Sequence, residues 1–267
     1  MANDLHMGAT RIGEVTACDS VGFRTAARLF TRPQPVTISM IALALIIPFY
    51  LVIGGALVPG RTVYMPAVWL DHALPVVPAW SVIYLSLFLA ALLPVFVVHQ
   101  QELVRRTVHA FLAIWLVAYV FFLVYPTIGP RSSARIVGDG FSSWLLQSIY
   151  SSDVRHNCFP SLHVAQCVLA ALVCDRVHRG IGAAAGLWAA LVGVSTVYTK
   201  QHYVLDVISG AVLAYLAHCV FLRGYPREAT PEIERRMAPI LALGAVGTYG
   251  IIVGIMWIAY LNGLVVT

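Results

Sequence analysis

An apolar stretch of the chain begins with a short polar motif, Pro160-Ser161-Leu162-His163. Proline favours the first position of a helix, and the amides that follow it then have no acceptor within the helix. Free amides at the positive end of the helix dipole bind anions such as phosphate. Ser161 adds a hydroxyl donor, and His163 lies close enough to give a proton to a leaving oxygen. The motif predicts an anion cradle beside an acid, although a polar helix cap uses the same residues.

A second histidine, His202, lies four residues before Asp206, again at the mouth of an apolar stretch. Residues four apart share one face of a helix, so the two side chains can meet. A carboxylate bonded to one ring nitrogen fixes the tautomer and leaves the other nitrogen with a free lone pair. An imidazole in this state acts as a nucleophile or a base. The alternative interpretation is a structural polar pair that joins two helices.

Basic residues accompany both motifs. Phosphoryl transfer depends on positive charge around the phosphate oxygens, and the planar fork of Arg131 suits that geometry. Lys200, the single lysine of the chain, lies two residues before His202, although a lysine that only anchors the chain at the membrane interface is the alternative. We expect Arg131, Lys200 and Ser161 to bind phosphate. Three further residues are candidates for contact with a substrate: Arg135, Arg155 and His156.

The composition places the chain in a membrane. Of its 267 residues 60% are apolar and 11% are charged, whereas a soluble domain has about 25% charged residues. A helix that crosses a bilayer needs roughly 17–25 apolar residues. Seven stretches of suitable length and composition occur, at 36–58, 79–98, 108–126, 159–175, 181–199, 203–222 and 238–261. We expect an all-α integral membrane protein, a helical bundle in which Asp206, an acid inside a span, is functional.

The distribution of Lys and Arg indicates the orientation, because segments rich in these residues stay in the cytoplasm. With the N-terminus inside, only five of the 17 Lys and Arg residues fall outside: Arg61, Arg131, Arg135, Arg155 and Lys200. Four of these five lie around the polar motifs, where they suit an anionic ligand. The net charge of +5 is thereby explained without a nucleic-acid partner.

The same orientation brings three segments with chemically active residues to one side of the membrane. The third span ends before Arg131, the fourth begins at Pro160, and the turn between the fifth and sixth contains His202. We therefore expect one active site that faces outside, in a protein of the bacterial cytoplasmic membrane. We also expect residues 1–35 to form a cytoplasmic segment without a cleavable signal peptide, and 36–267 to form a single transmembrane catalytic domain.

Two further patterns concern packing. A hydrophobic repeat at helical spacing occurs in the outer segment 127–158, at Phe141, Trp144, Leu145 and Ile149. It predicts a short helix that lies flat on the membrane, or an ordered loop that packs on the bundle. Pairs of small residues that allow helices to approach closely occur in Gly182-x-x-x-Gly186 and Gly250-x-x-x-Gly254.

The two histidine motifs and Arg131 resemble the type-2 phosphatidic acid phosphatase superfamily over about 125–210, and within it the branch that contains inositol phosphorylceramide synthases. The resemblance implies a core of six helices, with the seventh span as an addition. It also implies that His202, oriented by Asp206, attacks phosphorus and forms a phosphohistidine. His163 would protonate the leaving group and later activate the acceptor, while Ser161 and its neighbouring amides hold phosphate. The substrate would be a phospholipid or another lipid phosphate, and the acceptor water or a hydroxyl group.

The chain departs from the family pattern at two places. The family has Ser-Arg before the last histidine, whereas this chain has Ser195-Thr196, and it looks similar to the inositol phosphorylceramide synthase branch there and in His202-Tyr203. The family's first motif, a lysine followed by six residues and Arg-Pro, is missing. Arg32-Pro33 matches only the end of this motif, and it lies in the predicted cytoplasmic segment. The run from Pro126 to Arg131 looks like that branch's replacement. Both departures favour a transferase-like relative over a plain phosphatase.

Two other classes of function fit part of the pattern. A metalloenzyme would use His163, His202, Asp206 and His156 as ligands, but the nearby Arg and Lys would repel a cation and the chain lacks a dense ligand motif. A transporter or a non-catalytic phospholipid-binding protein is the other alternative. Against transport, the polar groups gather at one face and not at the midplane, where transporters bind their substrates. We expect an enzyme that uses neither a metal nor a cofactor.

Overall fold

The computed structural model describes residues 41–58, 60–133 and 138–264, and within these ranges the chain is helical without a strand. The predicted cytoplasmic segment, 1–35, lies outside the described residues. The first helical segment covers Ile41–Leu57. The elements in chain order are α3 (Phe49–Val52), the π-helix η1 (Ile53–Leu57), α4 (Trp69–Ala73), α5 (Trp80–Leu85), α6 (Leu87–Val97), α7 (Gln101–Val124), η2 (Pro130–Ser133), α8 (Phe141–Ser152), α9 (Leu162–Val177), α10 (Arg179–Tyr198), α11 (Val204–Phe221), η3 (Arg227–Ala229) and α12 (Glu232–Leu261).

Five of the described helical segments are long and apolar enough to cross a membrane: Trp80–Val97, Gln101–Val124, Arg179–Tyr198, Val204–Phe221 and Glu232–Leu261. They confirm the prediction of an all-α integral membrane protein. The two other predicted spans, 36–58 and 159–175, correspond to Ile41–Leu57 and to α9, which has 16 residues. Both are shorter than the other five, so the total of seven spans stays a prediction.

Two spans begin earlier than predicted, because charged residues in their first turns are paired. In α7, which begins before 108, Glu102 accepts hydrogen bonds from Arg105 and Arg106, with N···O distances of 2.7 Å. In α12, which begins before 238, Arg236 donates to Glu232 one turn earlier. These charges interrupt the apolar pattern of the sequence, whereas pairs three or four residues apart support a helix.

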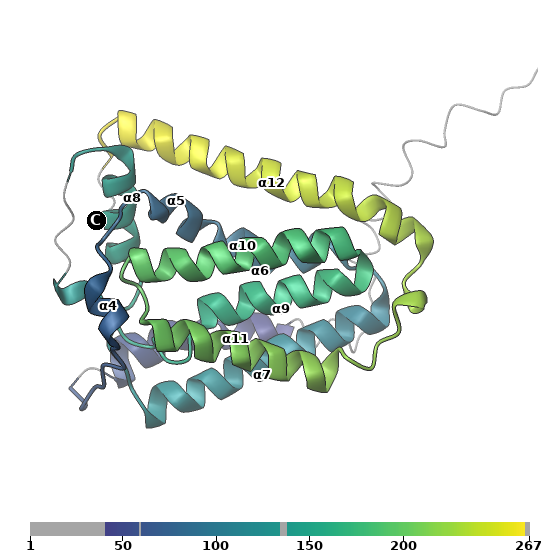
Figure 1. Cartoon of the computed structure of the whole chain (residues 1–267), viewed down its shortest axis with the longest axis horizontal. Coiled ribbons are helices and arrows are strands. Elements are labelled where there is room, and N and C mark those ends of the chain that lie inside the picture. The colour runs from purple at the N-terminus through teal and green to yellow at the C-terminus, as the bar shows by residue number, and fades with distance from the viewer. Residues whose placement is uncertain (1–40, 59, 134–137, 265–267) are drawn as a thin grey trace, which may run out of the picture.

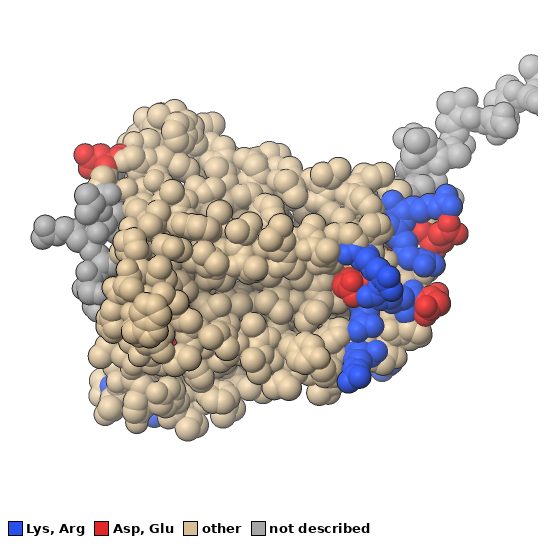
Figure 2. All heavy atoms as spheres, viewed as in Figure 1, with Lys and Arg blue, Asp and Glu red and all other residues tan. Residues whose placement is uncertain are grey.

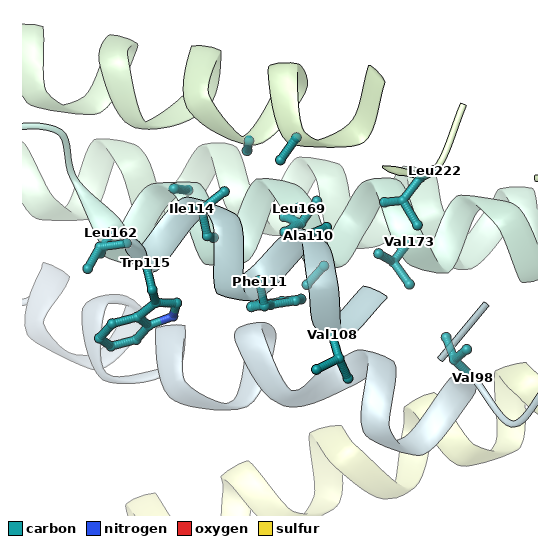
Figure 3. Close-up of a cluster of buried hydrophobic side chains, with 14 of the residues drawn as sticks. Val98, Val108, Ala110, Phe111, Ile114, Trp115, Leu162, Leu169, Val173 and Leu222 are labelled. Atoms are coloured by element: carbon teal, nitrogen blue, oxygen red, sulfur yellow. The ribbon is translucent and has the colours of Figure 1, made fainter. Parts of the chain in front are cut away.

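The long helices pack side by side around α9, which contacts α6, α7, α10 and α11 (Figure 1). Figure 3 shows the main hydrophobic core, in which Ile114 of α7 and Leu169 of α9 are fully buried. Lipid tails are as apolar as leucine, so close packing and not escape from water holds such helices together. The core therefore fixes α9, whose first turn carries His163, against its neighbours.

A short helix, α8, runs across one end of the bundle and not along it (Figure 1). Its residues Leu145, Leu146 and Ile149 are buried. Leu145 and Ile149 pack on the bundle beside Tyr84 of α5 and Cys167 of α9. The helix predicted from the hydrophobic repeat is thus confirmed, and its apolar face is covered by protein.

Charged residues gather at the ends of the bundle and leave the middle of the visible face almost free of charge (Figure 2). Most of the Lys and Arg side chains in this view cover the end at which α11 connects to α12 (Figures 1 and 2). The opposite end carries α4 and α8. A helical bundle that crosses a membrane typically has an uncharged middle and one basic end.

Glycines permit two close approaches between helices. A Cβ added at Gly182 would lie 2.5 Å from the backbone of Asp175, and a Cβ added at Gly210 would lie 2.4 Å from the carbonyl oxygen of Ser161. The predicted packing role is thereby confirmed for Gly182. Within the described residues no atom lies within 4 Å of such a Cβ at Gly186, Gly250 and Gly254. For the pattern in α12 the packing role stays a prediction.

We expect Gly210→Ala to lower the free energy of unfolding by about 1–3 kcal/mol, because the new methyl group would overlap the Ser161 carbonyl. Thermal unfolding of the purified protein in detergent micelles measures this change. Gly186→Ala is the matched control, since it adds the same methyl group to a helix in open space and should be neutral or slightly stabilising. Equal thermal midpoints for the two variants would contradict the prediction.

Candidate active site

Two imidazoles meet at the end of the bundle that carries α8. Nδ1 of His163 lies 2.8 Å from Nε2 of His202, and the two ring centroids are 5.1 Å apart. His163 belongs to the first turn of α9, and His202 to the turn that joins α10 and α11. His202 is only 3% exposed. The structure therefore places the two histidines that the sequence singles out in direct contact.

Asp206 approaches the other ring nitrogen of His202, with 3.4 Å between Nδ1 and Oδ2. The carboxylate is fully buried, and the same oxygen accepts the amide hydrogen of Tyr203 at 2.9 Å. A carboxylate that accepts from Nδ1–H leaves the lone pair on Nε2, so the hydrogen between the two imidazoles belongs to Nδ1 of His163. The pair thus presents a basic nitrogen on His202 that faces an N–H donor on His163. A contact as long as 3.4 Å is ordinary in a site without substrate.

A backbone contact between α9 and α11 holds the two histidines together. The amide of Ser161 donates to the carbonyl oxygen of Asp206 at 3.0 Å. The approach is possible because residue 210, one turn along α11, has no side chain. Since His163 and His202 lie only a few residues from this hydrogen bond, it fixes the distance between their rings.

The start of α9 corrects two details of the predicted anion cradle. Ser161 is the N-cap of the helix, and its hydroxyl oxygen accepts from the amide of Val164 at 3.3 Å. Pro160 therefore lies before the cap and not at the first helical position, and the Ser161 amide already has an acceptor. The amides of Leu162 and His163, at the first two helical positions, remain suited to an anion because the helix offers them no acceptor.

A tight turn carries His202 to its place. The amides of Gln201 and His202 both donate to the carbonyl oxygen of Thr196, at 2.9 and 3.2 Å, and Lys200 adopts a left-handed backbone with φ of 54°. The Lys200 ammonium donates to the carbonyl oxygen of Asp71 at 2.7 Å. Burial lowers the pKa of Lys200, and the charge of Asp71 opposes this shift. Lys200 thus ties the turn to α4, and its role in binding phosphate stays a prediction.

Arg131 lies beside this turn, paired with an acid. Its Nη2 is 2.7 Å from Oδ2 of Asp153, and its Nη1 donates to the Asp153 carbonyl oxygen at 2.9 Å. Nη2 also donates to Oε1 of Gln201, the residue before His202. The guanidinium carbon lies 5.2 Å from the centre of the Tyr150 ring. A buried cation is therefore held next to the residue that precedes the candidate nucleophile.

Several buried polar atoms around the histidines have no hydrogen-bond partner among the described residues, including Nε of Arg131, Nε2 of Gln201 and Oδ1 of Asp206. Most buried polar groups in proteins are paired, so such atoms need a physical explanation. Two of the three are donors, and one of these belongs to a cation. The oxygens of a phosphate group would satisfy both donors. This part of the site therefore suits the anion that the sequence predicts.

The structure places the three weaker candidates for substrate contact differently. Arg155 is exposed, and its carbonyl oxygen accepts from the amide of Gly129 at 2.8 Å. Nδ1 of His156 lies 3.0 Å from the carbonyl oxygen of Gly54 in η1, so this ring supports the bundle. Arg135 lies outside the described residues. Contact of these residues with a substrate stays a prediction.

Cys158 lies close to the side chains of His202 and Asp206. Their possible metal-ligand atoms are all within 4.8 Å of one another. This group differs from the metal alternative considered above, because Cys158 takes the place of His163 and His156. Burial, and then the charge of Asp206, raises the pKa of the Cys158 thiol well above its usual range. Metals bind the thiolate, so a thiol that keeps its proton is a poor ligand.

Three residues of the site belong to no sequence motif: Asp153, Tyr50 and Tyr84. The hydroxyl groups of Tyr50 and Tyr84 donate to the Asp153 carboxylate at 3.3 and 3.5 Å. Their rings pack edge-on against His163, with centroids 6.4 and 5.6 Å away. The sequence holds one indication of Asp153, which is that acidic residues are rare. The chain has only 12 Asp and Glu residues, so an acid in an outer segment that also contains arginine is a candidate partner for a buried cation.

Comparison with protein families gives one match. A family model described as the PAP2 superfamily matches residues 62–220, more than half of the chain. This range includes His163, His202, Asp206 and Arg131. Comparison with curated proteins and with solved structures gives no match. The match supports the superfamily that the motifs resemble, and not a particular branch within it.

We expect Arg131 and Asp153 to depend strongly on each other, because their side chains are only 5% and 19% exposed. Arg131→Met or Asp153→Asn alone should lower the free energy of unfolding by about 3–5 kcal/mol, since each leaves a buried charge unpaired. The double variant should lose less than the sum, with a coupling of about 0.5–3 kcal/mol. Unfolding of the three variants in micelles measures the cycle. The exposed pair Arg236–Glu232 is the control and should give about 0.3–0.5 kcal/mol. Similar coupling in both pairs would refute the expectation.

Proposed function

The chain belongs to the PAP2 superfamily, and on that premise we propose that it is a membrane phosphatase or phosphotransferase that cleaves a lipid phosphate ester through His202. Membership supports a phosphatase-type function on a lipid phosphate. The observation that carries the residue-level proposal is the 2.8 Å contact between the two imidazoles, with Asp206 on the far side of His202. This order supplies a nucleophile, a proton donor and an orienting group in one line.

The reaction proceeds in two steps in this proposal. The lone pair on Nε2 of His202 attacks phosphorus and forms the N–P bond. The ester P–O bond breaks while His163, which enters this step as the imidazolium ion, gives its Nδ1 proton to the leaving oxygen and becomes neutral. In the second step, His163 takes a proton from water or from an alcohol. The resulting oxygen attacks phosphorus, and the N–P bond to His202 breaks. The two rings must separate before the first step, because their present contact occupies the space that phosphorus needs.

Phosphate is held during both steps by charge and by unpaired donors. Arg131 Nε and Gln201 Nε2 face no acceptor among the described residues, and the amides of Leu162 and His163 begin a helix. The hydroxyl hydrogen of Ser161 is a further donor, because its oxygen only accepts from the backbone. These groups act on the charge that spreads over the three equatorial oxygens in the transition state.

The finer proposal is transfer of a phospho-headgroup, as in inositol phosphorylceramide synthases. Its support is the sequence Ser195-Thr196, where other members of the superfamily have an arginine, and the run that ends at Arg131. Thr196 is fully buried, and its carbonyl oxygen anchors the turn that carries His202. Arg131 reaches the same turn through Gln201, so it can supply the positive charge that position 196 lacks.

We further propose that the N-terminus lies in the cytoplasm and that the site faces outside, in a bacterial cytoplasmic membrane. The support is the basic end of the bundle, which is the end opposite to α4 and α8 (Figures 1 and 2). A lipid of the outer leaflet would then bring its phosphate to the level of the two histidines.

Labelled phosphate should be trapped on His202. Purified protein is mixed with phosphatidic acid that carries radioactive phosphate and quenched in alkali, in which phosphohistidine survives. His202→Ala should lose the label and at least about a thousandfold in turnover, because no nucleophile remains. His163→Ala should lose roughly 10²–10⁴-fold, the usual contribution of a proton donor. His72→Ala, at an exposed histidine of α4, is the control. Full turnover by His202→Ala would sink the proposal, and bound lipid without turnover in the wild type would favour a binding protein or transporter.

The acceptor can be tested on the trapped intermediate. We expect added polyol, with inositol as the probe, to shorten the life of the labelled enzyme and to appear in a phosphorylated product, because a transferase site accepts a hydroxyl group in preference to water. Glycerol at the same concentration controls for bulk solvent effects. Release of the label as inorganic phosphate at one rate, with or without inositol, would assign the protein to the hydrolytic members of the superfamily.

A further inference from the structure

A cavity of about 830 Å³ begins beside His163 and extends into the bundle. Its walls come from Ile41–Leu57, α6, α7 and α9, with smaller contributions from α5, α8 and α12. We propose that this cavity binds one hydrocarbon chain of the lipid substrate and thereby selects lipids with a long, unbranched chain. This inference rests on the proposed function and deepens it, because it names the part of the lipid that enters the protein.

The two ends of the cavity differ in chemistry. Its ionisable lining residues lie at the end next to the reactive imidazole: Tyr50, Tyr84, Asp153 and His163. Beyond them the walls from α6 and α7 are apolar except for Thr107, whose hydroxyl donates to the carbonyl oxygen of Leu103 at 2.7 Å. Figure 3 shows Val108, Phe111 and Trp115 on the same side of α7, one turn apart, and all three line the cavity. A lipid with its phosphate ester at His163 would therefore place its hydrocarbon chain against the apolar side chains of the cavity wall.

The cavity is about as long as one leaflet of a bilayer is thick, and it runs from the site toward the start of α7. Trp115 lies at the level of the site, because its ring centroid is 6.3 Å from that of Tyr50, which packs against His163. The lining continues along α7 from Trp115 to Val104, which corresponds to about 16 Å of helix. The hydrocarbon core of a bilayer is about 30 Å thick, so one leaflet contributes about 15 Å. A chain of ordinary length would fill the cavity from end to end.

The cavity opens sideways toward lipid. The large apolar lining residues that are exposed belong to two elements: Ile47 and Leu51 of the first helical segment and Phe88, Leu92 and Val95 of α6. These side chains form an apolar mouth between the two elements. A chain can therefore pass from the bilayer into the cavity without crossing water.

Fit, and not hydrophobicity, gives this cavity its selectivity. A lipid chain gains little free energy on moving from the bilayer to an apolar protein interior, because the two environments are equally apolar. Side chains that line an empty space lack partner atoms, and a chain of matching length supplies them. The volume lies within the range of about 300–1,000 Å³ of ordinary ligand sites. A chain held in this way also fixes the phosphate next to His163, which lowers the entropic part of the barrier.

The test is photo-crosslinking in micelles, which does not require turnover. The probe is dipalmitoyl phosphatidic acid with a diazirine near the end of one chain, and the protein is the full-length His202→Ala variant, which keeps the lipid unconverted. We expect crosslinks on the cavity wall, within Leu87–Val98 and Val104–Phe111. Labelling confined to lipid-facing residues such as Leu187, or equal labelling of the cavity by a phosphatidic acid whose labelled chain is methyl-branched, would overturn the inference.

A matched pair of added substitutions controls for folding. Ala91→Phe places a ring in the cavity and should reduce crosslinking of its wall about tenfold, because the ring takes up space that the lipid chain would occupy. Ala184→Phe adds the same ring to an exposed position of α10 and should change crosslinking less than about twofold. Equal effects of the two would count against the inference. Phosphate release from unlabelled dipalmitoyl phosphatidic acid by the wild-type protein tests the proposed function separately, because crosslinking and release can fail independently.

Discussion

The hydrogen bond from the Ser161 amide to the Asp206 carbonyl oxygen is the constraint on which the site depends. It joins the start of α9 to the first turn of α11 by backbone atoms alone. His163 follows Ser161 by two residues, and Asp206 faces His202, so this one contact sets the separation of the two rings. It exists only because α11 has a glycine at 210. The geometry of the site therefore comes from the starts of α9 and α11 and from the tight turn that carries His202.

The basic residues of the site are held by groups that lie far away in the sequence. Asp153, after α8, neutralises Arg131, and Asp71, in α4, accepts from Lys200. A side-chain oxygen of Asp71 also accepts from the amide of Val204 at the start of α11. Removing a charge from water is costly unless partners replace the lost hydration. The short helices at this end of the bundle thus make it possible to keep two cations buried, Arg131 and Lys200.

Much of this arrangement was predictable from the sequence, and the rest was not for physical reasons. The uncharged stretches predicted the five long apolar helical segments. The distribution of Lys and Arg predicted that His163, His202 and Arg131 lie at the same end of the bundle. The starts of α7 and α12 were missed, since ion pairs within one helix leave no apolar pattern. Asp153 and Tyr50 were missed because they contact each other from segments far apart in the sequence. Such a contact leaves no repeating pattern of residues that could reveal it. The sequence predicted that the Ser161 amide would bind the anion, whereas it donates to the Asp206 carbonyl oxygen. A hydrogen bond between two helices cannot be recognised from the residues near either partner.

The first helical segment, Ile41–Leu57, lies before the matched family range, yet it reaches the site. The Tyr50 hydroxyl contacts Asp153, its carbonyl oxygen accepts from Asn157 at 2.7 Å, and its ring packs on His163. Ile47 and Leu51 stand at the lateral mouth. Part of the proposed chain-binding cavity therefore comes from a segment outside the matched range, whereas both histidines lie within it. Exchange of this leading helix would change the mouth of the cavity and leave the sequence around the two histidines unaltered.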